Sequence, residues 1–267
     1  MRFLLTFVLL TSLFAQDRRV LVVTASSGDY IFGAGATLAR FIRDGWRVDV
    51  AQFGSGEKQS LGLTQAQTRM ANVQEGKAAA KLLGVKDTVD MDFKSGEIAY
   101  VSTTEMRNQL FALIRGMKPQ IIFIPDPYVH FQNDSDIVTV ARMAEEAWGY
   151  SGGAMFANEL TRMGYKPYGA PEVFYYAPYR PYRAGEGGTG RSGFVAIDVT
   201  ETMENKLGAL ELLLTHNRSW VAGHVGLRPD SEVSAYVRAF ATEMAEAVGS
   251  KHGFRYGEEF NHVGPRR

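Results

Sequence analysis

Residues 20–30, VLVVTASSGDY, decide the fold of this chain. The first four form an apolar run with the length and composition of a strand that is buried on both faces. Apolar residues then recur at helical spacing from Ile31 to Ile42, and Gly45 ends the pattern. A buried strand that leads directly into a helix is typical of a parallel α/β sheet. The turn Ala25–Tyr30 therefore lies beyond the carboxyl end of its strand, where such sheets bind ligands.

The same alternation of strand and helix continues along the chain. Strands are expected at Trp46–Phe53, Val89–Phe93, Ile121–Ile124, Val173–Tyr176 and Phe194–Ile197, and helices at about Thr64–Leu83, Thr104–Met117, Asp136–Trp148, Glu201–Thr215 and Ser231–Val248. Alternating elements favour parallel strands joined by right-handed crossovers. The sequence thus predicts an α/β fold with a doubly wound, mostly parallel open sheet flanked by helices, in a Rossmann-type topology. The loop Pro125–Ser135 is expected at the same sheet edge as the first turn.

Composition narrows the functional classes. The chain has 267 residues, with 29 basic and 29 acidic side chains and no cysteine. Balanced charge argues against partners such as nucleic acid or an acidic membrane surface. The absence of cysteine excludes disulfides and thiolate metal sites. No internal linker divides the chain, so residues 16–267 are expected to form a single domain.

Residues 1–15 have the pattern of a signal peptide, with a basic start, an apolar run from Leu4 to Phe14 and a small residue, Ala15, before a polar one. The run is shorter than the roughly 20 apolar residues that span a bilayer. We therefore expect cleavage after Ala15, export to the periplasm or beyond, and no stable membrane insertion afterwards.

The Gly33-Ala34-Gly35 segment raises the alternative of a nucleotide or nucleotide-sugar binding enzyme. The dinucleotide fingerprint requires a further Gly or Ala three residues later, where this sequence has Leu38. The glycines also fall inside the expected helix rather than in the turn before it. Close packing of the helix on the sheet is the other interpretation of these small residues.

Segments over most of the chain resemble, in order, those of the LmbE/PIG-L deacetylase family. That family opens with Ala-His-Pro-Asp-Asp-Glu followed by Gly-x-Gly-Gly-Thr-Leu, and Ala25–Ala39 stands in that place. The similarity continues at Ala78–Gly84, Ile114–Pro119, Pro125–Pro127, Ile197–Lys206 and Tyr256–Phe260. The resemblance implies an LmbE-like fold. It also implies the family's activity, in which one divalent metal, usually zinc, helps to remove the acetyl group from an N-acetylated amino sugar.

The resemblance places the family's metal ligands at Ser26, Asp29 and Ser135, and its general base at Gly28. Only Asp29 keeps the family's residue type, because the other two ligands are histidines and the base is an aspartate. Glycine cannot accept a proton, and one carboxylate with two hydroxyls is a poor donor set for zinc. We therefore assign no catalytic residue and expect no metal and no cofactor, with zinc only if the site proves functional.

Polar residues of the same loops suit a binding role. Asp29, Asp134 and His216 are expected to bind substrate, because His216 matches a family histidine close to the substrate pocket. His216 also fits a cation at a helix C-terminus. His130 could replace a lost metal ligand, and Asp136 fits the N-cap of the helix that follows it.

Three functional hypotheses follow. The first is a degenerate family member that binds an N-acetyl amino sugar or glycoconjugate without zinc hydrolysis. The second is an active metal-dependent N-acetyl-amino-sugar deacetylase rebuilt around Asp29, His130 and Asp134. The third is the nucleotide or nucleotide-sugar binding enzyme. Whether the protein is an enzyme stays open. If it is active, it hydrolyses an amide bond as an N-deacetylase. The aromatic run Tyr179–Tyr182 could stack on a sugar or simply form the loop after a strand.

Overall fold

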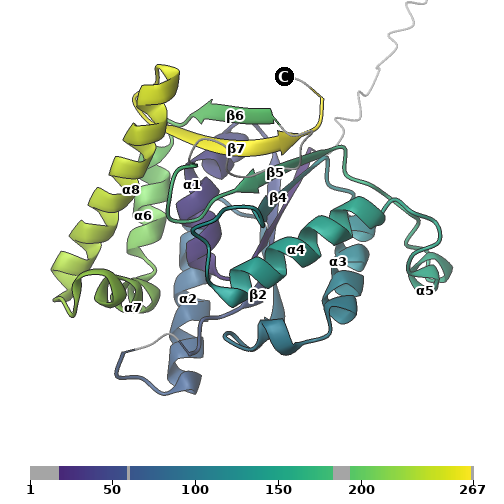
Figure 1. Ribbon diagram of the computed structural model, residues 1–267, viewed down its shortest axis with the longest axis horizontal. Helices are drawn as coiled ribbons and strands as arrows, with labels where there is room; N and C mark the ends of the chain where they lie inside the picture. Colours follow the sequence, from purple (N-terminus) through teal and green to yellow (C-terminus); the bar gives the residue numbers. More distant parts are fainter. Residues whose placement is uncertain (1–17, 59–60, 183–192, 266–267) are drawn as a thin grey trace, which may run out of the picture.

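A computed structural model describes residues 18–58, 61–182 and 193–265, which build a seven-stranded sheet in the order β3-β2-β1-β4-β5-β7-β6 (Figure 1). The strands are β1 (Arg19–Thr24), β2 (Arg47–Gly54), β3 (Asp87–Phe93), β4 (Ile121–Pro125), β5 (Glu172–Tyr176), β6 (Gly193–Asp198) and β7 (Gly257–Val263). Neighbouring strands from β3 to β5 pair in parallel, and β7 is antiparallel to both β5 and β6. The expected mostly parallel, doubly wound α/β sheet is confirmed.

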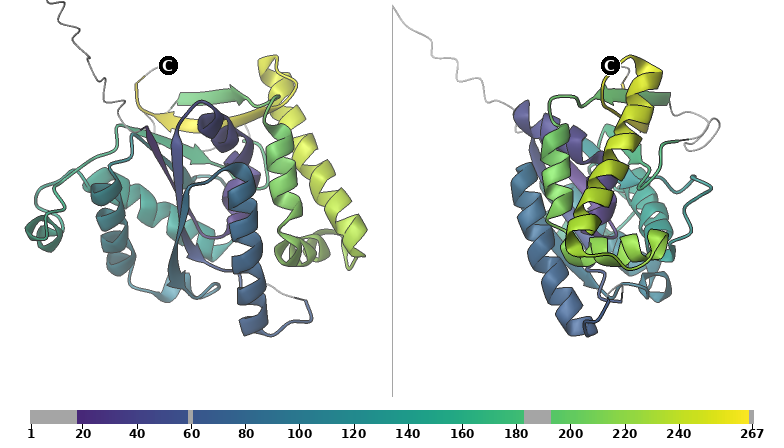
Figure 2. Two further views of the ribbon diagram at one scale, coloured as in Figure 1. Left: turned by 180° about the vertical axis from the view of Figure 1, so that it is seen from behind. Right: turned by 90° about the vertical axis from the view of Figure 1, so that its left-hand side faces the viewer.

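Helices cover both faces of the sheet (Figures 1 and 2). They are α1 (Ser27–Arg43), α2 (Gln65–Leu83), α3 (Thr103–Met117), α4 (Ser135–Tyr150), α5 (Asn158–Arg162), α6 (Met203–Glu211), α7 (Leu214–Val225) and α8 (Asp230–His252), with a short 3₁₀ turn at Ile98–Tyr100. Side chains of β1 alternate between two cores: Val20 and Val22 pack with α1, α6 and α8, whereas Leu21 and Val23 pack with α3 and α4. No helix in this part of the chain is long and apolar enough to span a membrane.

The structure corrects the sequence-based prediction at one helix. The single helix expected at Glu201–Thr215 is two helices, α6 and α7, separated at Leu212 and Leu213. Leu213 is buried in the core and has a non-helical backbone, with φ −86° and ψ 50°. Glu75 of α2 accepts hydrogen bonds from the backbone N–H and the hydroxyl of Thr215, both at 2.8 Å. A side chain from a distant helix thus satisfies the start of α7, which local sequence does not reveal.

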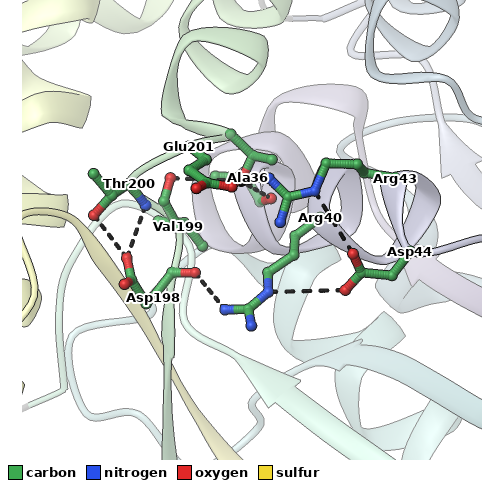
Figure 3. A network of polar contacts seen from close by, with 9 residues as sticks. Ala36, Arg40, Arg43, Asp44, Asp198, Val199, Thr200 and Glu201 are labelled. Atoms are coloured by element: carbon green, nitrogen blue, oxygen red, sulfur yellow. Dashed lines mark hydrogen bonds and ion pairs between the residues drawn. The ribbon is translucent and has the colours of Figure 1, made fainter.

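Helix α1 is fixed against the sheet along its length. Gly33 lies inside it, and a Cβ there would come within 2.5 Å of Tyr176 Cδ2, so the glycine permits close packing of helix on strand. Near its end, Arg40 donates to the carbonyl of Asp198 at 2.6 Å and Arg43 pairs with Glu201 (Figure 3). The predicted signal peptide, residues 1–15, lies outside the described residues, so export stays a prediction.

Candidate functional site

A cavity of about 400 Å³ opens beyond the carboxyl ends of β1 and β4. β1 pairs with β2 on one side and with β4 on the other, so the cavity lies where the order of strands reverses. Its lining comes chiefly from Ala25, Ser26 and Asp29, from residues 131–134, 136–137 and 178–180, and from α7. Both loops predicted to meet at this edge therefore contribute to one cavity.

Asp29 is the buried carboxylate at the base of the cavity, with only 2% of its surface exposed. It lies in the first turn of α1, where its Oδ2 accepts a hydrogen bond from the backbone N–H of Ser26 at 2.8 Å. Its Oδ1 accepts from the hydroxyl of Tyr179 at 2.8 Å. Burial, and then the charge of Asp134, raise the pKa of Asp29 to about 7, although these hydrogen bonds lower it.

His216 also lines the cavity, and its position corrects one sequence interpretation. It lies in the first turn of α7 rather than at a helix C-terminus, so the helix dipole disfavours a cation there. Burial lowers the pKa of His216 to about 4, against the opposing effect of Asp134. The imidazole is therefore neutral near pH 7.

The ring of His216 occupies the space beside Gly28. A Cβ built on Gly28 would lie 2.4 Å from Nε2 of His216, which is closer than any real contact. The same Nε2 lies 3.4 Å from the hydroxyl of Tyr179. The position that the resemblance assigns to the family's general base is thus closed by the imidazole ring of His216.

Tyr179 was not predicted as a partner of Asp29. Its backbone has φ +66°, a left-handed conformation that is costly for a non-glycine residue and that marks functional sites. Its ring packs between Phe32 and Trp220, with centroid distances of 4.9 and 5.8 Å. The tyrosine appeared in the sequence only as one member of an aromatic run, and pairing with a residue 150 positions away leaves no local signal.

Asp134, rather than Asp136, is the N-cap of α4. Its Oδ1 accepts from the backbone N–H groups of Asp136 and Ile137 at 2.9 and 3.2 Å, so the predicted cap at Asp136 is wrong. Asp136 is the second residue of the helix. It is only 8% exposed, and its Oδ2 accepts a hydrogen bond from the N–H of Gly96 at 2.5 Å. Both carboxylates line the cavity.

The structure places some of the predicted site residues in the cavity and others outside it. Ser26, Asp29, Asp134 and His216 share it, whereas Ser135 and His130 are exposed and stand outside its lining. Ser135 is the first residue of α4.

Aromatic side chains form the outer wall. His216, Trp220 and His224 follow one another at four-residue intervals on α7 and all line the cavity. The ring of His224 lies 4.4 Å from that of Trp220. This four-residue spacing is a readable helical signal, but the helix expected at Glu201–Thr215 ends before it, so α7 was not predicted.

The residues present do not fit a zinc ion. Both oxygens of Asp29 face hydrogen-bond donors, the hydroxyl of Tyr179 and the N–H of Ser26. The other family ligand positions are hydroxyls, and that of Ser135 is exposed. Zinc sites use imidazole, thiolate and carboxylate ligands. Within residues 18–58, 61–182 and 193–265, no group of three or more histidine and acidic side chains is arranged to hold a metal.

Comparisons with known proteins match this architecture. A family model described as PIG-L: GlcNAc-PI de-N-acetylase matches residues 21–148. Diacetylchitobiose deacetylase of Thermococcus kodakarensis is 24% identical over 255 residues, which cover 94% of this chain and 85% of the relative. The 4-oxalmesaconate hydratase of Pseudomonas putida is 24% identical over 215 residues, which are 76% of each protein.

A solved structure, N,N'-diacetylchitobiose deacetylase from Pyrococcus horikoshii, is similar with a TM-score of 0.77 and 23% identity, covering 94% of this chain and 85% of that one. At such identity the likeness concerns the fold rather than the reaction. The family model spans the turn that carries Asp29 and the loop that carries Asp134, so the match includes both loops of the cavity. Over residues 21–148 the chain therefore resembles the PIG-L family.

Proposed function

We propose that this protein is a degenerate PIG-L family member that binds an amino sugar or glycoconjugate in the cavity without zinc-dependent hydrolysis. The observation that carries the proposal is the joint replacement of ligand and base positions by Ser26, Gly28 and Ser135, while the cavity and Asp29 remain. A serine hydroxyl is a weak ligand for zinc, and glycine has no group to take a proton from water.

The packing around Gly28 supports the same proposal. His216 Nε2 stands where the first atom of any side chain at position 28 would have to lie. A carboxylate could not return there unless His216 moved. Tyr179 in turn donates to Asp29, whose carboxylate is therefore engaged as a hydrogen-bond acceptor. The site is arranged around an Asp–Tyr–His cluster rather than around a metal and its water.

A sugar is the ligand class that the cavity suits. Trp220 and Phe131 offer aromatic surfaces that can pack on the apolar face of a sugar ring. Carboxylates at the base can accept hydrogen bonds from hydroxyl or amino groups. Two relatives are named as diacetylchitobiose deacetylases, which directs the choice of ligand toward amino sugars.

Metal content and acetate release test the proposal together. We expect the purified protein to hold substoichiometric zinc and to release no acetate from N,N'-diacetylchitobiose, even when zinc is added. The double variant Ser26→His with Ser135→His puts imidazoles at the two positions that the resemblance assigns to histidine ligands. It should gain zinc, because two imidazoles and a carboxylate form an ordinary zinc site.

The matched control replaces the same two serines by alanine, which removes the hydroxyls without offering new ligands. That control should behave like the original protein in zinc content and thermal stability. Stoichiometric zinc in the original protein, together with acetate release that Asp29→Ala abolishes, would overturn the proposal.

A further inference from the structure

The segment that joins α4 to β5 exposes a group of large apolar side chains. Met155 and Met163 are 88% and 71% exposed, and Tyr150, Phe156 and Tyr165 are each more than a third exposed. α5 lies in this segment and stands away from the sheet and from the helices that cover it (Figures 1 and 2). Apolar surface gathered in one region marks an interaction site, whereas single exposed apolar residues do not.

A buried arginine fixes the shape of this segment. Arg115 of α3 is 1% exposed, and its guanidinium group contacts no carboxylate in the described part of the chain. It donates instead, at 2.8 to 3.2 Å, to four backbone carbonyls of the segment, those of Ser151, Gly153, Phe156 and Ala157. The ring of Phe156 also stacks on that of Tyr150, with centroids 4.7 Å apart. An ordered segment therefore presents the apolar side chains, which lowers the entropy cost of binding a partner.

Helix α5 turns two opposite charges outward. Leu160 packs against the core that α3 and α4 share. Residues three apart lie on the same face of a helix, so Glu159 and Arg162 lie together, on the side away from Leu160. Both are exposed, and neither side chain forms an ion pair within residues 18–58, 61–182 and 193–265. The exposed Met163 follows them at the end of the helix.

This face is complementary to itself. When two copies of a helix pack antiparallel across a two-fold axis, residues at equal distances from the axis face each other. An axis that passes between Leu160 and Thr161 brings Glu159 opposite Arg162 of the partner subunit, and the reverse pair forms at the same time. We propose that α5 and the exposed apolar side chains beside it form the contact between two copies of this chain in a reversible dimer.

The size of the surface makes the dimer a weak one. Five partly exposed side chains supply only part of the roughly 800 Å² that each partner buries in a stable complex. The dimer should therefore dissociate on dilution. It does not depend on what the cavity binds, because none of these side chains lines the cavity.

Sedimentation velocity of the purified protein over a range of concentrations measures the dimer. We expect the average sedimentation coefficient to rise with concentration. Glu159→Arg or Arg162→Glu alone places like charges opposite each other twice in the dimer, and should raise the dissociation constant at least about tenfold. The double variant with both substitutions exchanges the two charges and should return the constant to within about threefold of the original value.

A mixture of the two single variants tests the antiparallel arrangement. On this face the Glu159→Arg protein carries two arginines and the Arg162→Glu protein carries two glutamates. Each variant is thus repelled by its own copies and attracted by the other. An equimolar mixture should dimerise at a concentration at which each variant alone is monomeric.

Two methionine variants test the apolar part of the contact. Met163→Lys should weaken the dimer, because it places a charge within the apolar surface. Met70→Lys is the matched control, since Met70 is 64% exposed on α2 and should leave the dimer unchanged. All the substituted side chains are exposed, and thermal melting checks that the variants fold.

Four results would overturn the proposal. A protein that stays monomeric at every concentration has no such dimer, and a dimer that withstands both single charge reversals uses another surface. Equal weakening by Met70→Lys would make the effect one of net charge. Binding of the monomer to phosphatidylcholine vesicles, lost in Met163→Lys, would assign this face to a lipid surface.

Discussion

Helix α1 borders two buried polar regions that differ in how their charge is balanced. At its middle, Lys206 Nζ lies 2.7 Å from Glu258 Oε1, and the two side chains are 2% and 4% exposed. Lys206 also donates to the carbonyl of Phe32 at 2.6 Å, and Glu258 accepts from the N–H of Thr37 at 2.7 Å. At its start, Asp29 is equally buried but its hydrogen-bond donors are neutral.

The difference indicates what each region is for. The pair at the middle of α1 joins the helix to α6 and β7 with each charge opposite its partner, as a structural element requires. The region at the start of α1 keeps a carboxylate in an environment that resists its ionisation, beside an open cavity. Such imbalance is a cost in the free protein that a ligand can relieve.

The largest effect should come from breaking the balanced pair. Lys206→Met leaves Glu258 buried without its cation, and we expect the free energy of unfolding to fall by about 3–5 kcal/mol. Urea denaturation followed by circular dichroism measures it. Lys251→Met is the control, because Lys251 is 46% exposed in its contact with Glu259 and should contribute at most about 1 kcal/mol. Similar losses in the two variants would show that burial does not determine how much an ion pair contributes to the free energy of unfolding.

Removing the charge of Asp29 should have the opposite effect and raise stability, because the hydrogen-bond donors of this carboxylate are neutral. The pKa of Asp29 rises from 3.8 to about 7 in the folded protein, so the folded state binds more protons than the unfolded state between these values. Stability associated with the protonated carboxyl is present below pH 3.8 and is lost as the pH rises through about 7. Asp29→Asn removes this titration and should raise stability at pH 8 by about 2–4 kcal/mol relative to its effect at pH 4.

Melting temperatures of Asp29→Asn and the original protein, measured from pH 4 to pH 8, check this expectation. Asp49→Asn is a suitable control, because Asp49 is also fully buried but pairs with Arg47 at 2.9 Å. Asp49→Asn should lower stability at pH 8, since it removes the buried carboxylate that faces Arg47 and Arg19. If Asp29→Asn is likewise destabilising at pH 8, Asp29 is balanced by a group that the described contacts do not include.

Much of the fold follows from local pattern. The strand at Val20–Val23 is apolar because both of its faces are covered, and the helix ends at Gly45 and Gly84 use residues that favour the left-handed backbone. The division between α6 and α7 was missed because Glu75, from another helix, caps the second one. β7 was not predicted as a strand, and its place between β5 and β6 depends on pairing between distant segments.

Site residues were predictable where a motif fixes their position in a loop at the sheet edge. They were not predictable where side chains from distant segments meet in the folded chain. Asp29 and Asp134 follow directly from the two loops at the sheet edge. Tyr179 reaches Asp29 from a loop 150 residues later, and His216 reaches Gly28 from the misassigned helix. The resemblance predicts a carboxylate at position 28, where this chain has glycine, and the fold brings the ring of His216 against that glycine.

The contact between Gly28 and His216 gives the smallest of the predicted effects and the most specific test. Gly28→Ala puts a methyl group 2.4 Å from Nε2 of His216, and we expect a loss of about 1–2 kcal/mol of stability from overpacking. Gly149→Ala, near the end of α4, meets no heavy atom within 4 Å and should be neutral or slightly stabilising, as alanine favours helix. In a His216→Ala background the loss at position 28 should disappear, and this double-mutant coupling is measured by urea denaturation. A loss that persists without the imidazole would mean that the backbone at position 28 requires glycine, whichever side chain lies beside it.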